Sequence, residues 1–463
     1  MTQSLSVIGL GKLGAPMAAC FASKGFRVLG VDQDVCKVES INRGAAPVFE
    51  PRLEEVLQAA EGRLTATRDV QAAVAATDVT FIVVATPSEP GGGFSLRHVL
   101  PACEAIGQVL RAKQEFHLVC LTSTVMPGTT GGPVRSALEQ ASGKQCGVDF
   151  GLCYNPEFIA LGSVIRDFLN PDFLLIGESD PRSGNVLQEI YRRVCENTPA
   201  ITRMNFINAE ITKLSINTYV TTKISFANML ARICERLPEA SVDVVTAALG
   251  LDSRIGPKYL KGALSYGGPC FPRDNLALAA LARQVGAPAD IAQVTERFNR
   301  SQIKWLADLV ESHSPQGGTV GILGLTYKTN TYVVEEAAGL LLASELASRS
   351  VSLVVYDPAG IKNSAAVLDH KVRFASSSQE CIQASDLVVV STPWQEFSDI
   401  PAETWARHSP ARTVIDCWRA LQNLEKRAGV RYLSLGTGAL PTAANLAAST
   451  HAQILVPCPA GSV

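Results

Sequence analysis

The stretch with the most chemical character surrounds Cys270. Residues 266–275 read Tyr-Gly-Gly-Pro-Cys-Phe-Pro-Arg-Asp-Asn. The paired glycines let the backbone approach a ligand closely, and the two prolines stiffen the loop and fix the direction of the thiol. Arg273 places a positive charge near the sulfur and favours the reactive thiolate, while Asp274 can orient or share a proton. The alternative is a tight turn around a buried structural thiol, but the rest of the sequence favours a reactive Cys270.

Two further polar sets precede this loop. Residues 208–236 form a long helical pattern without Gly or Pro, in which Lys213 and Asn217 share one face. A solvated polar pair is the alternative interpretation, but a helix of this length between two α/β halves is typical of a hinge, a dimer face or both. A basic cluster follows before the Cys loop, and it is either a solvated patch or an anion site, because Arg binds phosphate in a bidentate manner; it consists of Arg254, Lys258 and Lys261.

A glycine-rich turn opens the chain. A buried strand at 5–8 leads into Gly9, Gly11 and Gly14, a helix follows, and a second strand at 27–31 is closed by Asp32. These glycines fit the tight turn, the pyrophosphate approach and the helix–strand contact of a dinucleotide site, where helix amides face the phosphates. Asp32 lies about 20 residues further on, where an acid accepts the ribose hydroxyls. No Arg follows it directly, so NAD is favoured over NADP.

Polar residues then follow several predicted strands, at the sheet edge where ligands bind in such folds. The strand at 78–85 ends in Thr86 and Pro87, and the strand at 116–121 ends in a hydroxyl-rich segment that contains Thr124. Both threonines are alternatively simple helix caps. The other elements predicted here are a helix at 98–113, a short strand at 151–153 before Asn-Pro-Glu-Phe (155–158), and a closing strand at 173–177.

A second α/β unit begins near Gly317. It repeats strand, turn, helix and strand followed by Asp357, but it lacks the full glycine fingerprint. We therefore expect a sister Rossmann-like domain that serves a second ligand. The predicted elements are strands at 319–324, 352–356, 386–391 and 413–415, the last of them, and helices at 241–249 and at about 335–348; residues after about 440 are predicted to be a tail.

Composition limits the class of protein. The 463 residues are 47% hydrophobic and 18% charged, so the chain can bury two or three cores. The net charge of -2 argues against a nucleic-acid partner. The 12 Cys form no CxxC pair and no zinc-like spacing, which indicates reduced thiols, no metal site and a cytoplasmic location. The N-terminus lacks the features of a signal peptide, and no apolar run reaches the ~18 residues that would span a bilayer.

Taken together, these motifs carry a family resemblance. Over roughly residues 4–425 the sequence resembles the UDP-glucose/GDP-mannose dehydrogenase family, and the Cys loop and its order relative to the other motifs are specific to that family. The matching motifs are Gly9–Gly14, Ser123-Thr124-Val125, Asn155-Pro156-Glu157-Phe158, Lys213 with Asn217, Arg254-Ile255-Gly256, 267–274 and Gly324-Leu325-Thr326-Tyr327-Lys328.

The resemblance implies an architecture and an activity. The expected domains are an NAD-binding Rossmann domain (1–204), a central helical dimerisation domain with the Cys loop (205–300), a nucleotide-sugar-binding Rossmann-like domain (301–440) and a tail (441–463). The expected enzyme is a homodimer that oxidises the C6 hydroxymethyl of a nucleotide sugar to a carboxylate with two NAD. UDP-glucose to UDP-glucuronate is the expected reaction, with GDP-mannose or a UDP-N-acetylhexosamine as alternative substrates.

The resemblance also implies roles for individual residues. Cys270 attacks the aldehyde and forms a thiohemiacetal and then a thioester. Lys213 and Asp274 hold the water that takes the hydroxyl proton, Lys213 and Asn217 stabilise oxyanions, and water assisted by Glu157 hydrolyses the thioester. Thr124 positions that water. The implied cofactor residues are Gly9, Gly11, Lys12, Leu13, Gly14, Asp32, Thr86, Pro87 and Thr124. The implied substrate residues are Glu157, Phe158, Lys213, Asn217, Arg254 (from a partner subunit), Tyr259, Lys261, Gly267, Lys328 and Arg419.

The sequence departs from the family pattern at a few positions. Leu161 stands where the family usually has an acid, and Tyr332, Val333 and Glu335 stand where it has Asp-Asp and then an Arg that contacts the cofactor. Arg273 stands where Lys is commoner. Two other classes compete with the main hypothesis: a two-electron β-hydroxyacid dehydrogenase, which needs neither the Cys loop nor the second half, and a nucleotide-sugar-binding homologue without catalysis. NADH release with a panel of nucleotide sugars separates the three.

Overall fold

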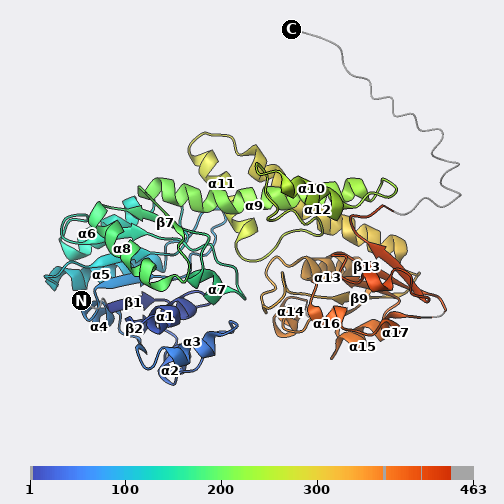
Figure 1. Cartoon of the computed structure of the whole chain (residues 1–463), viewed down its shortest axis with the longest axis horizontal. Helices are drawn as coiled ribbons and strands as arrows, with labels where there is room; N and C mark the ends of the chain where they lie inside the picture. The colour runs from blue at the N-terminus through green and yellow to red at the C-terminus, as the bar shows by residue number, and fades with distance from the viewer. Residues whose placement is uncertain (1–3, 369–371, 408, 439–463) are drawn as a thin grey trace, which may run out of the picture. The chain divides into compact units, whose positions relative to one another are not determined.

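The computed structural model describes residues 4–368, 372–407 and 409–438. The chain forms two compact units (Figure 1). The first contains the chain through Tyr219 together with Gly267–Arg297 and Thr326–Glu336, and the second contains Val220–Tyr266, Phe298–Leu325 and the chain from Ala337 on. This division differs from the domain boundaries predicted above, because the Cys loop joins the N-terminal unit. The predicted tail, residues 441–463, lies outside the described residues.

A largely parallel sheet organises the first unit. Its eight described strands run in the order β3-β2-β1-β4-β5-β6-β7-β8, and all pairs are parallel except β6 with β7. The strands are β1 (Ser4–Ile8), β2 (Arg27–Val31), β3 (Leu64–Thr67), β4 (Val79–Ile82), β5 (Leu118–Leu121), β6 (Gly151–Tyr154), β7 (Phe173–Glu178) and β8 (Ala200–Met204). The helices are α1 (Gly14–Ser23), α2 (Val35–Asn42), α3 (Leu53–Ala59), α4 (Val70–Ala75), α5 (Val99–Ala112), η1 (Thr130–Val134), α6 (Arg135–Ser142), α7 (Val164–Leu169), α8 (Pro181–Val194) and α11 (Phe271–Gln284).

Helices cover both faces of this sheet. One apolar core holds side chains of α1, α3, α7 and α8, and a second core holds those of α4, α5 and α6. Strands covered on both faces read as continuous apolar runs, and the central strands β4, β5 and β6 are accordingly buried throughout. The predicted α/β fold with an N-terminal Rossmann domain is therefore confirmed for this unit.

The turn from β1 into α1 explains its glycines. Gly9 has φ +99, and a Cβ there would lie 2.6 Å from the Val83 carbonyl oxygen. A Cβ on Gly14 would lie 1.8 Å from the Gly9 oxygen, so Gly14 serves the contact between strand turn and helix. A Cβ on Gly11 would meet nothing within 4 Å. Gly11 therefore borders open space, which is where a pyrophosphate would approach the backbone.

The second unit repeats this architecture. Its six described strands run in the order β11-β10-β9-β12-β13-β14, all parallel. They are β9 (Thr319–Leu323), β10 (Ser352–Tyr356), β11 (Arg373–Phe374), β12 (Leu387–Val390), β13 (Arg412–Asp416) and β14 (Val430–Ser434). Its helices are α10 (Val242–Leu251), α13 (Ala338–Ser348), α14 (Ile361–Leu368), α15 (Ser378–Gln383), α16 (Gln395–Ser398), α17 (Ala402–Trp405) and η3 (Gln422–Leu424), while α9 (Phe206–Cys234) and α12 (Asp290–His313) contribute to both units.

The turn after β9 has the same geometry as the turn after β1. Gly324 has φ +99 and a Cβ on Gly339 would lie 2.0 Å from its oxygen, as for Gly9 and Gly14. The Leu325 N–H donates to Asp357 at 2.7 Å, as the Leu10 N–H donates to Asp32 at 2.8 Å. The second Rossmann turn is thus retained, and residues 326–336 are inserted within it.

Some element predictions were wrong. The sequence interpretation omitted the edge strands β3, β8, β11 and β14, so 413–415 is not the last strand. The helix expected from Glu335 begins at Ala338, because Glu336 adopts φ +52, which an α-helix does not accept. The long helix was predicted within two residues at each end. In the described part of the chain, no helix combines the length and apolar character needed to cross a bilayer.

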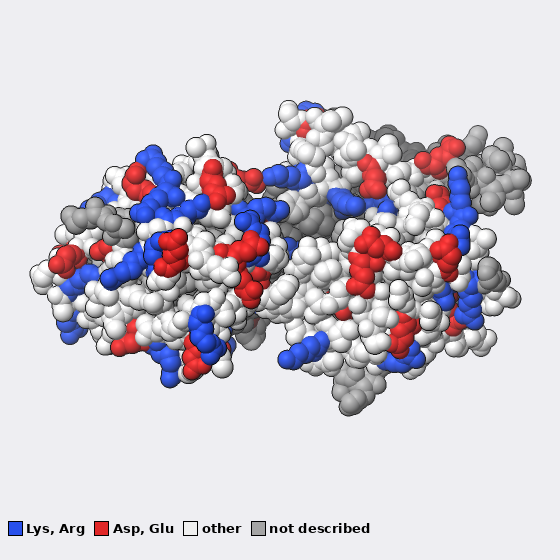
Figure 2. Space-filling model, turned by 60° about the horizontal axis from the view of Figure 1, so that its bottom comes forward, with Lys and Arg blue, Asp and Glu red and all other residues white. Residues whose placement is uncertain are grey.

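Surface charge is mixed in both units. On the face shown in Figure 2, basic and acidic side chains alternate over each unit without a continuous field of one sign. This distribution matches the net charge of -2 and offers no extended basic surface on that face.

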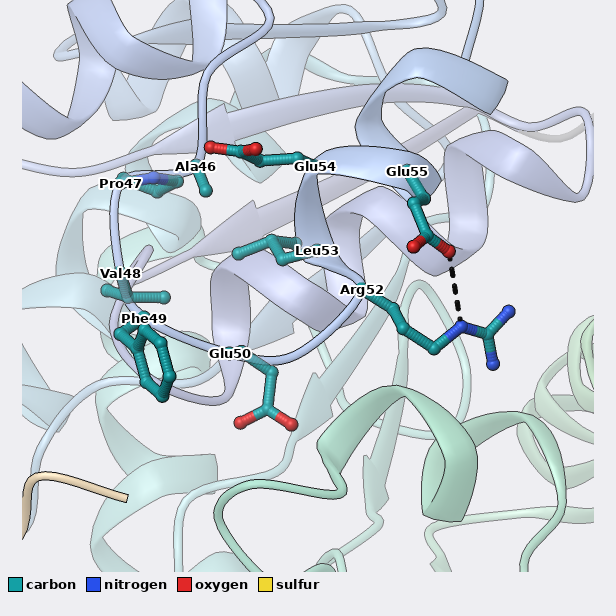
Figure 3. Close-up of a pocket in the computed structure, with 9 residues that line it drawn as sticks. All are labelled: Ala46, Pro47, Val48, Phe49, Glu50, Arg52, Leu53, Glu54 and Glu55. Atoms are coloured by element: carbon teal, nitrogen blue, oxygen red, sulfur yellow. Dashed lines mark hydrogen bonds and ion pairs between the residues drawn. The ribbon is translucent and has the colours of Figure 1, made fainter. Parts of the chain in front are cut away.

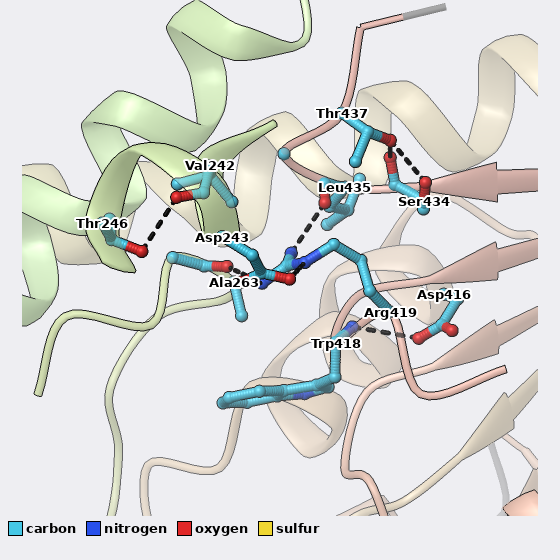
Figure 4. A network of polar contacts seen from close by, with 12 residues as sticks. Val242, Asp243, Thr246, Ala263, Asp416, Trp418, Arg419, Ser434, Leu435 and Thr437 are labelled. Carbon is cyan, nitrogen blue, oxygen red and sulfur yellow. Dashed lines mark hydrogen bonds and ion pairs between the residues drawn. The ribbon is translucent and has the colours of Figure 1, made fainter. Parts of the chain in front are cut away.

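Arg419 has an internal role in the second unit (Figure 4). Its Nε and Nη2 donate to the carboxylate of Asp243 at 2.7 and 2.9 Å, and its Nη1 and Nη2 also donate to the carbonyl oxygens of Leu435 and Gly262, both at 2.7 Å. The side chain is only 2% exposed. Arg419 thus joins the end of β13 to α10 and the chain after β14, while its assignment to the substrate stays a prediction.

We predict that Arg419→Leu lowers the free energy of unfolding by about 2–3 kcal/mol, because two buried carbonyl oxygens lose their donor. The urea midpoint measures this loss. Arg427→Leu, which removes an exposed ion pair to Glu403, is the control and changes stability by less than about 0.5 kcal/mol. Unchanged stability together with a raised KM for the sugar would contradict this structural role and support the substrate assignment of Arg419.

A second prediction separates the two glycines of the first turn. Gly11→Ala leaves stability unchanged and weakens NAD binding about tenfold or more, because its Cβ enters only the open space at the turn. Gly14→Ala destabilises the fold by about 3 kcal/mol, because the Gly9 oxygen must move. Thermal melting and NAD titration of both variants test this; equal effects of the two on melting would contradict it.

Candidate active site

Cys270 lies at the N-terminus of α11, as the residue that caps it. Among the described cysteines only Cys36 and Cys270 are exposed. Although part of Cys270 reaches solvent, the protein around the sulfur raises the pKa of the thiol, and Asp274 raises it further, while Arg273 and Lys213 act in the opposite direction. Arg273 thus acts on the thiol in the expected direction, but burial and Asp274 outweigh it.

Asp274 connects the Cys loop to the long helix. Its carboxylate is buried and accepts a hydrogen bond from Asn217 Nδ2 at 2.6 Å and from Arg273 Nε at 3.3 Å. The Arg273 guanidinium lies 4.7 Å from the centre of the Phe94 ring. The charge of Arg273 is thus shared among the Cys270 thiol, Asp274 and an aromatic face.

Lys213 links the same helix to the Asn-Pro-Glu-Phe segment. Its ammonium donates to the carbonyl oxygen of Glu157 at 2.6 Å and lies 4.6 Å from the centre of the Phe158 ring. Lys213 is 7% exposed, so a charged group is held where little water competes. The predicted pair Lys213 and Asn217 therefore faces both Glu157 and Asp274.

Glu157 lies behind this pair. Burial raises its pKa from the ordinary 4.5 to about 7, against the opposing influences of the Tyr191 hydroxyl and of Lys213. Its Oε1 lies 2.9 Å from the Tyr191 hydroxyl. A carboxyl that titrates near neutrality suits proton transfer to or from water. Sequence reasoning did not include Tyr191, because nothing in the local pattern of α8 distinguishes it from a core residue.

The hydroxyl-rich strand ends lie together. Thr86 Oγ1 donates to the Thr124 carbonyl oxygen at 2.7 Å, and Ser123 Oγ donates to that of Val84 at 2.6 Å. The segment after Thr124 is held from α9, where Glu210 accepts the N–H groups of Gly128 and Thr130 at 2.6 and 2.7 Å. Thr124 is thereby positioned at the sheet edge, next to the turn that carries Thr86 and Pro87.

Asp32 closes the dinucleotide turn. Its carboxylate accepts the N–H groups of Leu10 and Asp34 and contacts Lys37 Nζ at 3.2 Å. This geometry places an acid beside the glycine turn, as the ribose hydroxyls of a dinucleotide require. Lys37 is a further residue at this position that the sequence interpretation missed; it lies one helical turn into α2.

Residues 326–336 contain several of the departures from the family pattern, and they lie against the glycine turn that follows β1. The Tyr332 ring packs edge-on to Phe49 at 6.1 Å, and Lys12 Nζ lies 5.1 Å from its centre. Two of the departures from the family pattern thus have a local account: Tyr332 makes aromatic and cationic contacts, and the Glu335 carbonyl oxygen accepts the Gly268 N–H at 3.0 Å. The segment contacts both the glycine turn and the Cys loop.

Figure 3 shows the pocket formed by the loop between α2 and α3. It has a volume of about 540 Å³ and is lined by Ala46, Pro47, Val48, Phe49, Glu50, Arg52, Leu53, Glu54 and Glu55. The buried Glu50 accepts the N–H groups of Gly162 and Val164 at 2.9 and 2.8 Å. Glu50 is near Lys328, whose pKa is lowered by burial and raised in part by Asp167 and Glu50. Glu50 thus supports the chain after Phe158, a role that the sequence pattern did not indicate.

The remaining predicted substrate residues divide between the units. Gly267 and Lys328 belong to the first unit, with Cys270. Arg254, Tyr259 and Lys261 are exposed residues of the second unit, where Arg254 pairs with Asp252 at 2.6 Å and Tyr259 adopts φ +64. Their assignment to the substrate stays a prediction.

Comparison with known proteins matches the whole architecture. Three models of the UDP-glucose/GDP-mannose dehydrogenase family match: its NAD binding domain at residues 3–195, its central domain at 207–301 and its UDP binding domain at 321–423. The chain is 35% identical to UDP-glucose 6-dehydrogenase AglM of Haloferax volcanii over 94% of its length and 100% of the relative's. It is 36% identical to GDP-mannose 6-dehydrogenase of Pseudomonas aeruginosa over 76% of its length and 80% of the relative's.

A solved structure gives the same result. The UDP-glucose dehydrogenase of the archaeon Pyrobaculum islandicum superposes with a TM-score of 0.86 at 34% identity, covering 95% of this chain and 98% of that one. The glycine turn, the acid at Asp32 and the open space at Gly11 fit the cofactor of the matched NAD binding domain. The chain therefore belongs to the UDP-glucose/GDP-mannose dehydrogenase family, and it is an NAD-dependent oxidoreductase with the three domains of that family.

Proposed function

We propose that this chain is a nucleotide-sugar 6-dehydrogenase that converts UDP-glucose to UDP-glucuronate by a four-electron oxidation. The observation that carries the proposal is the connection of Cys270, Asp274, Asn217, Lys213 and Glu157 within one unit. UDP-glucose is favoured over GDP-mannose because the UDP-glucose 6-dehydrogenase relative matches nearly the full chain, whereas the GDP-mannose relative matches three quarters of it. A UDP-N-acetylhexosamine is a third candidate substrate.

The first oxidation converts the C6 alcohol to an aldehyde. Bound NAD supplies the hydride acceptor for each of the two oxidations. A water held by Lys213 and Asp274 takes the hydroxyl proton. The sulfur of Cys270 then adds to the aldehyde carbon, the thiol proton passes to the carbonyl oxygen, and a thiohemiacetal forms. Lys213 and Asn217 stabilise the negative charge that develops on that oxygen.

The second oxidation removes a hydride from the thiohemiacetal carbon and a proton from its hydroxyl, which leaves a thioester. Water positioned by Thr124 attacks the thioester as Glu157 accepts a proton, and the C–S bond breaks to release the acid and the thiol. Because Glu157 must be ionised for this step and its pKa is raised to about 7, hydrolysis slows as the pH falls through that value. Arg254, Tyr259, Lys261, Gly267, Lys328 and Phe158 are the proposed contacts of the nucleotide sugar.

Two variants test this mechanism. Cys270→Ser lowers turnover to the acid by roughly 10³-fold or more, because serine cannot form the thioester that water hydrolyses readily. Glu157→Gln still forms the thioester and accumulates it, seen as a burst of two NADH per site and a mass shift on the Cys270 peptide. Cys36→Ser, at the other exposed cysteine, is the control and keeps normal turnover.

Other stoichiometries point to the competing classes. One NADH per sugar would support the hypothesis of a two-electron β-hydroxyacid dehydrogenase, whereas near-normal acid production by Cys270→Ser would exclude the thioester route. Tight binding of nucleotide sugars without NADH release would support a binding protein. The panel of UDP-glucose, GDP-mannose and UDP-N-acetylhexosamines also decides the base and the sugar.

We also infer a homodimer through α9. The helix presents an apolar stripe to solvent, while Leu214 packs inward against Phe94 and Ala277. Steps of three, four, seven and eight residues keep the stripe on one helical face. Its exposed members are Ile207, Ile211, Tyr219, Phe226, Met229 and Ile233.

We predict that Phe226→Glu combined with Ile233→Glu gives a monomer, because two charges within an apolar contact must be desolvated on association. Light scattering across a concentration series measures the mass. Val367→Glu, at an exposed apolar residue of α14, leaves the dimer intact. A native protein that is monomeric at every concentration would refute the dimer.

A further inference from the structure

The hydroxyl of Tyr191 contacts two oxygens. Its Oη lies 2.5 Å from Asn155 Oδ1 and 2.9 Å from Glu157 Oε1. The orientation of the Asn155 amide follows from its other contact, since Asn155 Nδ2 donates to the Leu175 carbonyl oxygen at 3.0 Å. Oδ1 therefore faces Tyr191. A tyrosine hydroxyl has one proton, so it donates to only one of the two oxygens.

The protons can be assigned from these contacts. Asn155 Oδ1 has no proton to give, so the short contact to Asn155 requires Tyr191 as its donor. The contact between Tyr191 and Glu157 then requires a proton on Glu157. Tyr191 and Asn155 are buried, at 0% and 1% exposure, so solvent does not replace the hydrogen bond between them at low cost, whereas Glu157 is half-buried. The chain of donors runs from the Glu157 carboxyl to Tyr191 and on to Asn155.

We propose that Tyr191 is a positioning residue whose single hydroxyl proton can be donated either to Asn155 or to Glu157. This competition, called the proton contest below, keeps Glu157 protonated until it acts as the base in hydrolysis. When Glu157 loses its proton, the Tyr191 hydroxyl turns to the carboxylate and leaves Asn155 Oδ1. Tyr191 thus favours the ionised form of Glu157, and Asn155 opposes it. The role of Glu157 in hydrolysis rests on the proposed function; the proton contest does not.

The ring of Tyr191 is held independently of its hydroxyl. It packs against Phe21 of α1 and Phe168 of α7, with ring centres 6.4 and 5.9 Å away. The hydroxyl can rotate but the ring cannot follow Glu157. Tyr191→Phe therefore removes the proton and retains the packing.

Other ionisable groups around Glu157 act on it in a known direction. Lys213 of α9 favours its ionised form. The thiols that interact with it carry no charge at neutral pH, because burial raises their pKa; they are Cys20 of α1, Cys120 of β5 and Cys195 after α8. The contest for the Tyr191 proton is thus distinct from the effect of neighbouring charges.

Infrared difference spectroscopy of the unliganded enzyme tests the proposal directly. The carboxyl band that is lost in Glu157→Gln reports the titration of Glu157, and in the native enzyme its midpoint lies near pH 7. Tyr191→Phe raises this midpoint and Asn155→Leu lowers it, each by roughly one pH unit. A general loosening of the site would shift both variants in the same direction and would overturn the proposal, as would a native midpoint near the ordinary value of 4.5.

The pH dependence of thioester hydrolysis adds a kinetic arm. Its acidic limb moves up in pH for Tyr191→Phe and down for Asn155→Leu, and opposite movements support the proposal. If Asn155→Leu does not fold, an unmoved midpoint in Tyr191→Phe overturns the proposal by itself. If Cys270→Ser keeps near-normal acid production, the thioester route of the proposed function fails, while the infrared result still decides the proton contest.

Discussion

The hydrogen bond from Asn217 to Asp274 is the contact on which the site depends. It joins α9 to the first turn of α11, and Cys270 caps that same turn. Because Asp274 is buried, its charge needs these partners, and their loss would leave an uncompensated carboxylate beside the thiol. The same contact orients Asn217, and one helical turn earlier Lys213 reaches Glu157. One buried carboxylate thus connects Cys270 with Asn217 and Lys213, and through Lys213 with Glu157, which are the residues of the proposed mechanism.

Buried carboxylates serve a second purpose in this unit. Glu210 accepts two backbone N–H groups after β5, and Glu50 accepts two after the Asn-Pro-Glu-Phe segment. Loops have few backbone partners of their own, and an acid with two acceptor oxygens satisfies two N–H groups at once. The strand-end loops that carry Thr124 and Glu157 are therefore held from α9 and from the loop before α3.

Both sheets contain the same type of turn, and the turn of the second sheet carries an insertion. In each unit a glycine with positive φ starts the turn, and an Asp at the end of the next strand accepts the following N–H. The second turn contains an insertion, residues 326–336, that belongs to the first unit and contacts the Cys loop through Gly268. The insertion explains why the second half lacks a continuous glycine fingerprint although its backbone geometry is retained.

The sequence by itself determined the features that depend on local chain chemistry. Backbone freedom and hydrophobic periodicity are encoded by neighbouring residues. They predicted the glycines of the first turn, the acid at Asp32, the buried central strands and the helix with Lys213 and Asn217. Tertiary structure decided the rest, because it depends on partners far apart in the chain. The net effect on the Cys270 thiol follows from surrounding protein rather than from adjacent Arg273. The hydrogen bonds of Arg419 to Asp243 and to two carbonyl oxygens depend on residues far away in the chain, and the sequence did not indicate them. The contact of Tyr191 with Glu157 joins residues 34 apart in sequence, and only the packing of α8 against the sheet brings them together.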